Sequence, residues 1–391
     1  MHGPIHLVGL MSGTSCDGID AAVVAFGAGR PRLLHFQSTP MPRELREPAM
    51  RLAAPGVHEI DPMGSLDAAL GEAFAAAALA AIAGAGLTPA DIMAIGSHGQ
   101  TIRHRPRGVD GGRPFSLQIG CASTIAERTG ITTVADFRRR DLAAGGEGAP
   151  LVPFAHRLLF GRDDADTAVV NIGGIANISY LGRDGRVTGF DTGPGNMVMD
   201  ALMLAISDGR AAYDADGALA AAGRVDTDLL AELMAHPFLS RTPPKSSGRE
   251  DFGADFAARI LAANIDDAAR LATACELTAR TIAGAAAWLP SPPAHWHIGG
   301  GGAANRHLMA RLATLLAPAP VASTAAAGVP PEAVEAVSFA VLAGQTLRGL
   351  PNTVASVTGA THDTVGGHIA PGANWPRLLE TLGAWTRSPT P

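Results

Sequence analysis

The chain has few of the residues on which several common protein classes depend. It contains three cysteines, Cys16, Cys121 and Cys275, too few and too scattered for a disulfide framework or a cysteine metal cluster. Its 13 histidines include no HExxH motif, which argues against a catalytic zinc site. The N-terminal MHGPIHLVGL has no basic segment before its apolar run, so a secretory signal is not expected. These absences predict a reducing compartment, the cytoplasm.

Charge is also sparse. Charged residues make up 17% of the chain and the formal net charge is −6, which argues against nucleic-acid binding through a basic surface. Lys245 is the single lysine, so any lysine chemistry must use this residue. The alanine-rich stretch 68–87 is interrupted by Glu72, and we expect a packed helix there rather than a membrane span. No membrane partner is therefore expected.

The length of 391 residues predicts two domains, and the pattern along the chain repeats. Apolar runs predict strands at 5–11, 20–26, 32–38, 92–97, 115–120 and 131–136, with helices near 43–54, 66–86 and 121–130. The second half opens in the same way, with strand, glycine-rich tip and strand over 167–181, a third strand at 186–191 and a helix from 195. Further on we expect a strand, glycine turn and helix over 294–312 and a helix over 334–347, whereas the tail from 351 has no clear pattern. Two such starts indicate an approximate internal duplication.

The turn between the first two strands, SGTSCDGID, is rich in glycine and hydroxyl groups. Backbone N–H groups and hydroxyls at Gly13, Thr14, Ser15, Asp17, Gly18 and Asp20 could bind phosphates, although the stretch lacks the GxxxxGK[ST] pattern of a P-loop. An ordinary hairpin turn, which needs glycine and aspartate for its dihedrals, is the alternative. Two later glycine-rich tips favour the phosphate interpretation: Asn171, Gly173, Gly174 and Asn177, and Gly299 to Gly302 before Asn305.

Asp191 lies in GFDTGPGN, at the end of a predicted strand that turns sharply into a helix. A carboxylate in this position could act as a general base or hold a metal ion through water. The alternative is a residue that only begins the helix. We favour the functional interpretation because the Pro-Gly turn and the two phosphate-like tips accompany it.

Polar residues also cluster in SHGQTIRHRP, residues 97–106, expected just past a strand. They suit recognition of a polyhydroxylated ligand. A serine nucleophile is disfavoured because Ser97 and His98 are adjacent on an extended segment and point in opposite directions, and no GxSxG motif occurs. Residues 136–150 could be a solvated charged turn or could present Arg138 to a substrate carboxylate.

Eight motifs together resemble one enzyme family. They occur in this order over nearly the whole chain: GLMSGTSCDGID, GSHGQTIRH, DFRRRDLAAGGEGAPLVP, NIGGIANIS, FDTGPGNMVMD, PPKSSGRE, GGGAANRHLM and EAVSFAVLA. This set is similar to that of the anhydro-N-acetylmuramic acid kinases of peptidoglycan recycling. The resemblance implies an α/β fold with two RNase H-like domains of the actin/hexokinase/sugar-kinase superfamily and an interdomain ATP cleft. It implies domains of 1–137 plus about 355–391, and 138–354.

The resemblance also implies roles for individual residues. Asp191 would be the catalytic base, and it would hold Mg²⁺ through water, with Asp17 or Asp20 as the second choice. The sugar would contact Ser97, His98, Gln100, Arg138 and Glu335, although Glu335 could instead be a helix-surface carboxylate. The ATP-binding residues would be Gly13, Thr14, Ser15, Cys16, Asp17, Gly18, Ile19, Asp20, Asn171, Gly173, Gly174, Gly299, Gly300, Gly301, Gly302 and Asn305.

The implied reaction joins hydrolysis to phosphorylation. Water opens the 1,6-anhydro ring of 1,6-anhydro-N-acetylmuramic acid and the freed 6-oxygen takes the γ-phosphoryl group of ATP. A plain amino-sugar kinase of the same fold and a non-catalytic nucleotide-dependent binding protein are the alternatives. A homodimer is an assembly that the sequence leaves open.

Overall fold

The computed structural model describes residues 4–385, and these divide into two compact units. The first unit comprises 1–159 and 333–391, and the second comprises 160–332. Segments 138–159 and 333–354, expected in the second domain, thus lie in the first unit. The reason for the second segment is packing, because α13 (Val334–Leu347) lies against strands of the first unit.

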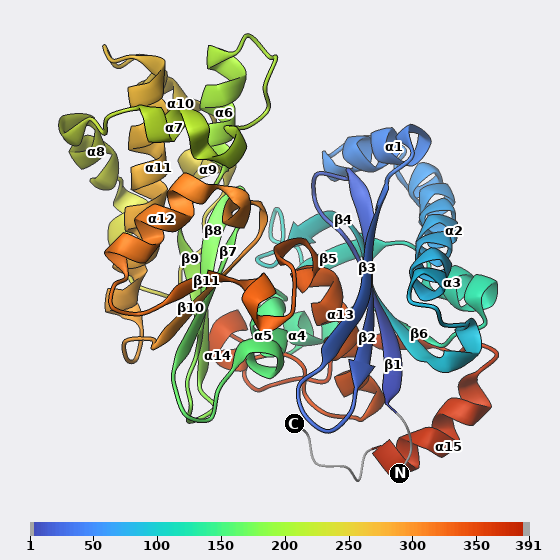
Figure 1. Ribbon diagram of the computed structural model, residues 1–391. Coiled ribbons are helices and arrows are strands. Elements are labelled where there is room, and N and C mark those ends of the chain that lie inside the picture. Colours follow the sequence, from blue (N-terminus) through green and yellow to red (C-terminus); the bar gives the residue numbers. More distant parts are fainter. Residues whose placement is uncertain (1–3, 386–391) are drawn as a thin grey trace. The chain divides into compact units, whose positions relative to one another are not determined.

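Within the described residues the first unit is built on a seven-stranded sheet. The strand order is β12-β6-β4-β1-β2-β3, with β5 paired to β4 off this path. Strands β1, β4 and β6 are parallel to one another, whereas β2 and β12 run antiparallel to their neighbours (Figure 1). The elements of this unit are β1(Ile5–Ser12), β2(Gly18–Phe26), β3(Arg32–Pro40), α1(Arg43–Ala53), α2(Ile60–Gly84), η1(Pro89–Asp91), β4(Ile92–Arg105), β5(Phe115–Ile119), α3(Ala122–Thr129), β6(Thr133–Ala135), α4(Arg139–Ala143), α5(Val152–Phe160), α13, α14(Ala355–Thr358), β12(His368–Ala370) and α15(Trp375–Trp385).

The second unit repeats this arrangement in a five-stranded sheet, counted over the described residues, with the order β11-β10-β7-β8-β9. Its first three strands form an antiparallel meander, and β10 and β11 run parallel to β7. Its elements are β7(Thr167–Ile172), β8(Ile175–Leu181), β9(Val187–Pro194), α6(Met197–Ile206), η2(Ala215–Gly217), α7(Ala218–Ala222), α8(Thr227–Met234), η3(Pro237–Ser240), α9(Arg249–Phe252), α10(Ala254–Leu261), α11(Asp267–Gly284), η4(Ala285–Trp288), β10(His295–Gly299), η5(Gly301–Ala304), α12(Arg306–Leu315), β11(Val321–Ser323), η6(Thr324–Ala327) and η7(Pro331–Ala333). The predicted duplication is confirmed, since in each sheet the third, second, first and fourth strands of the unit are neighbours in that order.

Alternation along β1 sends side chains to two faces of the first sheet. Val8 and Leu10 join a buried cluster with Leu70 and Phe74 of α2. The intervening Gly9 faces α13 on the other side, where an added Cβ would lie 1.8 Å from the carbonyl oxygen of Ala336. Helices therefore cover both faces of this sheet.

Helix α2 is long and apolar enough to cross a membrane by length and composition alone. Half of its most apolar window is buried within the unit, however. Its carboxylates also have protein partners, because Asp67 accepts a hydrogen bond from Gly120 N–H at 2.7 Å and Glu72 pairs with Arg128 at 2.7 Å. The prediction of a packed helix is confirmed.

Two expectations about elements were incomplete. Strand β4 continues to Arg105, so residues 97–105 lie within the strand rather than past it, because its second half pairs with β5 from Gln100 to Arg105. The tail, which showed no pattern, contributes β12, and this strand pairs with β6. Both features depend on pairing between distant segments, which local patterns do not reveal.

The contact between Gly9 and α13 gives a stability prediction. Gly9→Ala should lower the free energy of unfolding by about 3 kcal/mol, because the new methyl group forces β1 and α13 apart. Gly64→Ala is the matched control in α2, where a Cβ meets nothing within 4 Å, and it should be neutral or stabilising by up to about 1 kcal/mol. Urea unfolding followed by circular dichroism measures both, and equal stability of Gly9→Ala and wild type would contradict the packing described.

Candidate active site

Two glycine-rich turns of the second unit are joined by their backbones. Strands β7 and β8 are connected by Gly173 and Gly174, whose carbonyl oxygens accept hydrogen bonds from the segment between β9 and α6. Asn196 N–H donates to Gly173 O at 2.7 Å, and Gly195 N–H donates to Gly174 O at 2.9 Å. A Cβ on Gly195 would lie 2.2 Å from Gly173 O, so this approach requires glycine. The glycine-rich turn at Gly173 and Gly174 therefore meets the turn that follows Asp191.

The third glycine turn lies beside the same strand end. Gly299 pairs with Asn171, and Gly300 has a φ of +73°, a conformation that favours glycine. An added Cβ on Gly300 would lie 2.5 Å from Asn171 Oδ1. Asn305 then begins α12 as its N-cap, accepting from Leu308 N–H at 2.9 Å. The structure thus gathers the predicted residues of the second unit, Asn171, Gly173, Gly174, Gly299–Gly302 and Asn305.

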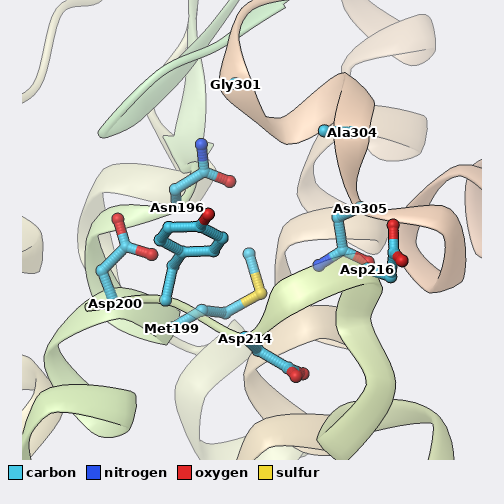
Figure 2. A pocket seen from close by; sticks show the side chains of 9 residues that line it. Asn196, Met199, Asp200, Asp214, Asp216, Gly301, Ala304 and Asn305 are labelled. Carbon is cyan, nitrogen blue, oxygen red and sulfur yellow. The ribbon is translucent and has the colours of Figure 1, made fainter. Parts of the chain in front are cut away.

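A cavity of about 350 Å³ opens next to these turns, wholly within the second unit (Figure 2). Its lining residues are Asn196, Met199, Asp200, Tyr213, Asp214, Asp216, Gly301, Ala304 and Asn305. Its size and its mixture of apolar and polar groups suit a small organic ligand. In Figure 2, Asn196 and Asp200 of the α6 side lie across from Asn305 and Asp216.

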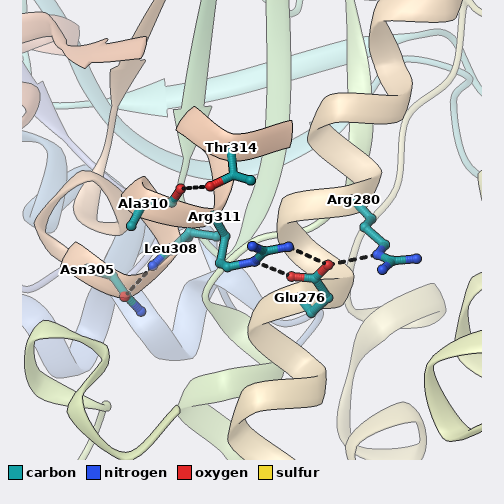
Figure 3. A network of polar contacts seen from close by, with 7 residues as sticks. All are labelled: Glu276, Arg280, Asn305, Leu308, Ala310, Arg311 and Thr314. Carbon is teal, nitrogen blue, oxygen red and sulfur yellow. Dashed lines mark hydrogen bonds and ion pairs between the residues drawn. The ribbon is translucent and has the colours of Figure 1, made fainter. Parts of the chain in front are cut away.

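Helix α12, which follows this cavity, is fixed to α11 by an ion pair network (Figure 3). Glu276 of α11 is buried and accepts from Arg311 of α12 at 2.7 Å and from Arg280 at 2.8 Å. Burial raises the pKa of Glu276, but the hydrogen bonds from Arg311 and Arg280 outweigh it and leave the pKa below its usual value. The carboxylate therefore stays ionised and holds the middle of α12, at Arg311, against α11.

Asp191 lies within β9, and the segment between η3 and α9 holds it on both sides. Its backbone N–H donates to Lys245 O at 3.0 Å, and its Oδ2 accepts from Ser247 N–H at 2.9 Å. Burial raises the pKa of Asp191 to about 6, an effect that Ser247 N–H and Lys245 oppose and Glu250 reinforces. Within the described residues, Oδ1 accepts no hydrogen bond and is available to a ligand or water.

Lys245 is anchored rather than free. Its Nζ donates to Phe238 O at 3.4 Å and to Leu239 O at 3.3 Å, and it lies 4.8 Å from the centre of the Phe238 ring. Burial lowers the pKa of this lysine. The lysine therefore fastens its own segment to η3, and with it the backbone groups that contact Asp191.

In the first unit, the predicted phosphate turn is fixed by Gln100. Ser12 Oγ donates to Gln100 Oε1 at 2.7 Å, and Gln100 Nε2 donates to Gly13 O at 3.0 Å. The side chains of Cys16 and Ile19 are buried in the core, so only their backbone groups can face a ligand. Gln100 itself is fully buried and shapes the turn from behind.

His98, Arg138 and Glu335 form a second polar group in the first unit. His98 Nδ1 is 2.9 Å from Gly99 O, and its Nε2 accepts from Arg138 at 2.8 Å. Burial holds the pKa of His98 well below its usual value, with Arg138 adding to the effect, so the ring is neutral. Nδ1 then carries the proton and Nε2 is the acceptor, a tautomer assigned from its partners.

Arg138 connects this histidine to a carboxylate. It also donates to Gly148 O at 2.9 Å, and burial lowers its pKa to about 10 while Glu335 opposes the shift. Glu335 is half-buried, not a surface carboxylate. Burial raises the pKa of its carboxyl group, and the negative charge of Asp20 adds to this effect. Ser97 is also fully buried. Ser97, His98 and Gln100 thus pack inside the protein, whereas Glu335 has partial access to solvent.

Comparison with known proteins identifies the family. The sequence profile described as anhydro-N-acetylmuramic acid kinase matches residues 5–372. The chain belongs to the anhydro-N-acetylmuramic acid kinase family. It is therefore an enzyme, a kinase that transfers a phosphoryl group from ATP to an amino sugar.

Relatives cover almost the whole chain. The anhydro-N-acetylmuramic acid kinase of Xanthomonas axonopodis pv. citri is 47% identical over 373 residues, which are 94% of this chain and 98% of that protein. The one from Shewanella woodyi is 43% identical over 371 residues, 94% of this chain and 99% of that protein. The resemblance inferred from the eight motifs is confirmed.

Solved structures resemble the chain more distantly. An activator of 2-hydroxyisocaproyl-CoA dehydratase from Clostridium difficile with bound ADPNP is 12% identical, with a TM-score of 0.42 over 86% of this chain and 93% of that one. A ROK family glucokinase from Streptomyces griseus with glucose and AMPPNP is 15% identical, with a TM-score of 0.39 over 87% and 99%. The predicted α/β class with two sheet-containing domains is confirmed by the two sheets of the chain itself.

Sequence reasoning missed part of the cavity. Asn196, Met199, Asp200, Tyr213, Asp214 and Asp216 were not among the predicted residues. One signal was present, since the spacing of Asn196, Met199 and Asp200 places them on one face of a helix that begins at a glycine turn. The loop residues Tyr213 to Asp216 carry no recognisable motif.

The raised pKa of Asp191 gives a pH prediction for the family's reaction. Below about pH 6 the carboxyl group becomes protonated and cannot take a proton, so kcat/KM should fall tenfold per pH unit there. Steady-state kinetics over about four pH units, spanning acidic and neutral pH, measure this limb, while circular dichroism checks folding.

A variant of a neighbouring carboxylate tests whether Asp191 is the group that titrates. Glu250→Gln removes a carboxylate that raises the pKa of Asp191, so the acidic limb should move to lower pH. An acidic limb near the ordinary aspartate pKa in the wild type, or no movement in the variant, would contradict Asp191 as the group that titrates.

Proposed function

We propose that the enzyme opens the 1,6-anhydro ring of 1,6-anhydro-N-acetylmuramic acid with water and phosphorylates the 6-oxygen, with Asp191 as the base. The products are N-acetylmuramic acid 6-phosphate and ADP. The observation that carries this assignment is the geometry of Asp191, whose Oδ2 is fixed by Ser247 N–H while its Oδ1 accepts no hydrogen bond within the described residues. A carboxylate held in this way can orient and deprotonate one water molecule.

The chemistry then proceeds without a covalent enzyme intermediate. Asp191 takes a proton from water as the water oxygen attacks the anomeric carbon from the face opposite the bridge, which inverts that centre. The bond from C1 to the bridging oxygen breaks, and this 6-oxygen attacks the γ-phosphorus of ATP as the bond to ADP breaks. The pKa of about 6 suits a base that is ionised at neutral pH.

We place the phosphates at the glycine turns. In the second unit these are Asn171 to Gly174 and Gly299 to Gly302, and the adjoining cavity would take the nucleoside. In the first unit, the turn from Gly13 to Asp20 offers hydroxyls and backbone N–H groups. Transfer then depends on fixed donors around the phosphoryl group.

We place the sugar at Arg138 and Glu335 of the first unit. Arg138 is suited to the carboxylate of the muramic acid, and Glu335 to its hydroxyl or amide groups. His98 is best described as a positioning residue, because both of its ring nitrogens already have protein partners. The same applies to Gln100, which fixes the turn at Gly13.

Mg²⁺ fits the donors present. Over residues 4–385 no group of three or more His, Cys, Asp or Glu side chains gathers to hold a metal ion. Kinases hold Mg²⁺ by one or two carboxylates together with phosphates and water, a role open to Asp191 through water or to Asp17 or Asp20. The ion would neutralise charge on the phosphates.

We further propose a cytoplasmic location, which is consistent with three free cysteines in the described chain. We also propose a homodimer, which light scattering can test.

The test of the proposed function is the mass of the product. Incubation with ATP, Mg²⁺ and 1,6-anhydro-N-acetylmuramic acid should give a sugar heavier by one water and one phosphoryl group. A phosphorylated sugar without the added water would indicate a plain amino-sugar kinase. An unchanged sugar with ATP bound would indicate a nucleotide-dependent binding protein.

Substitution of the base tests the residue assignment. Asp191→Asn should lower kcat by at least about a hundredfold, the usual contribution of a positioned base, while ATP binding by calorimetry changes little. Asp184→Asn is the matched control, because Asp184 lies exposed in the turn between β8 and β9 and pairs with Arg186. Most of the turnover surviving in Asp191→Asn would exclude this mechanism.

A further inference from the structure

The cavity of the second unit contains one carboxylate that the protein leaves unpaired. Asp200 lies on α6, one turn beyond Asn196, and lines the cavity. Among the described residues no group donates a hydrogen bond to its oxygens and no cation pairs with it. Burial raises the pKa of Asp200 to about 6, so desolvation is not offset by any neighbour. A group in this state is satisfied by water or by a ligand that brings donors.

The other two carboxylates of the cavity are already used. Asp214 accepts from Leu219 N–H and Ala220 N–H, both at 2.9 Å, and thereby begins α7. Asp216 lies 3.4 Å from Arg306 Nε. Asp200 is therefore the carboxylate of this cavity that remains for a ligand.

Its place on α6 indicates which part of a nucleotide it would meet. The helix begins at Asn196, whose backbone N–H is bound to the glycine turn at Gly173. Asp200 lies four residues further, about 6 Å along the helix axis at a rise of about 1.5 Å per residue. If the phosphates lie at the glycine turns, Asp200 lies about one sugar ring away from them. This distance corresponds to the ribose, which precedes the nucleotide's base.

We propose that Asp200 accepts hydrogen bonds from the 2′- and 3′-hydroxyl groups of the nucleotide's ribose and makes the enzyme selective for ribonucleoside over deoxyribonucleoside triphosphates. Two neighbouring hydroxyls match the two oxygens of a carboxylate, and hydrogen bonds to an ionised group are about twice as strong as neutral ones. A site built to bind hydroxyls rejects a ligand that lacks them, because the buried acceptor is then left unpaired. This inference rests on the proposed nucleotide site.

The wall of the cavity opposite Asp200 presents a hydrogen-bond donor, which suits the base of the nucleotide. Asn305 keeps its Oδ1 on Leu308 N–H, which directs its amide nitrogen to the cavity as a donor (Figure 2). Donors on that side suit acceptor nitrogens of a base, whereas the acceptor Asp200 lies on the side of Asn196. The cavity thus separates a hydroxyl-binding side from a base-binding side.

The experiment compares ATP, 2′-deoxyATP, 3′-deoxyATP and inosine triphosphate as phosphoryl donors for the anhydro sugar. In the wild type, kcat/KM should be at least roughly tenfold higher with ATP than with either deoxynucleotide, as expected for loss of one charge-assisted hydrogen bond. In Asp200→Asn this preference should shrink to roughly threefold or less, while the ratio of ATP to inosine triphosphate stays at its wild-type value. A loss of the ATP-to-inosine triphosphate ratio instead would assign Asp200 to the base and overturn the proposal.

Asp216→Asn is the control across the same cavity. Its positive φ of 58° is tolerated by asparagine, and any effect on KM should fall equally on ATP and 2′-deoxyATP. Thermal unfolding of each variant checks folding, and the wild-type donor series tests the proposal without any substitution. Equal use of ATP and 2′-deoxyATP by the wild type would overturn it. Absence of any sugar phosphorylation with ATP would instead refute the proposed function.

Discussion

Two backbone carbonyl groups, those of Gly173 and Gly174, hold the polar groups of the second unit in place. They accept hydrogen bonds from the N–H groups at 195–197, where β9 ends and α6 begins. Asp191 lies just before this junction and Asp200 just after it. The spacing between Asp191 and the cavity carboxylate Asp200 is therefore set by main-chain hydrogen bonds. A methyl group at Gly195 would separate the turns and displace both carboxylates.

The first unit uses close backbone approach in another way. Gly9 of β1 and Gly96 of β4 have no side chain where α13 crosses them, and a Cβ on Gly96 would lie 2.2 Å from Phe339 O. The close packing brings Glu335, near the start of α13, into electrostatic contact with Asp20 and Arg138. The polar cluster of this unit thus depends on two glycines that never touch it. Their role is to set the position of a helix against a sheet.

Local patterns were sufficient to predict the meander strands of both units and the glycine turns. Alternating apolar residues and glycine-rich tips gave the meander strands of both units, and Asp191 followed from the sharp turn after its strand. Pairing between distant segments was not predictable in this way. The extension of β4 depends on β5, and the place of α13 in the first unit depends on residues more than 320 positions earlier, at β1. Tyr213 and Asp214 reach the cavity through a loop whose path no local pattern defines.

Asp191 and Asp200 show two ways of keeping a half-buried carboxylate. Burial raises the pKa of each to about 6, so each carries a desolvation cost when ionised. For Asp191 the protein offsets part of this cost itself, through Ser247 N–H and the nearby Lys245, whose backbone is tied to β9. The carboxylate of Asp191, the proposed base, is consequently oriented before any substrate arrives, which is what preorganised catalysis requires. For Asp200 no such donor is present in the described chain, so a ligand that brings hydroxyls would relieve the cost on binding. Under the two proposals made above, the same physical penalty would serve catalysis at Asp191 and nucleotide selectivity at Asp200.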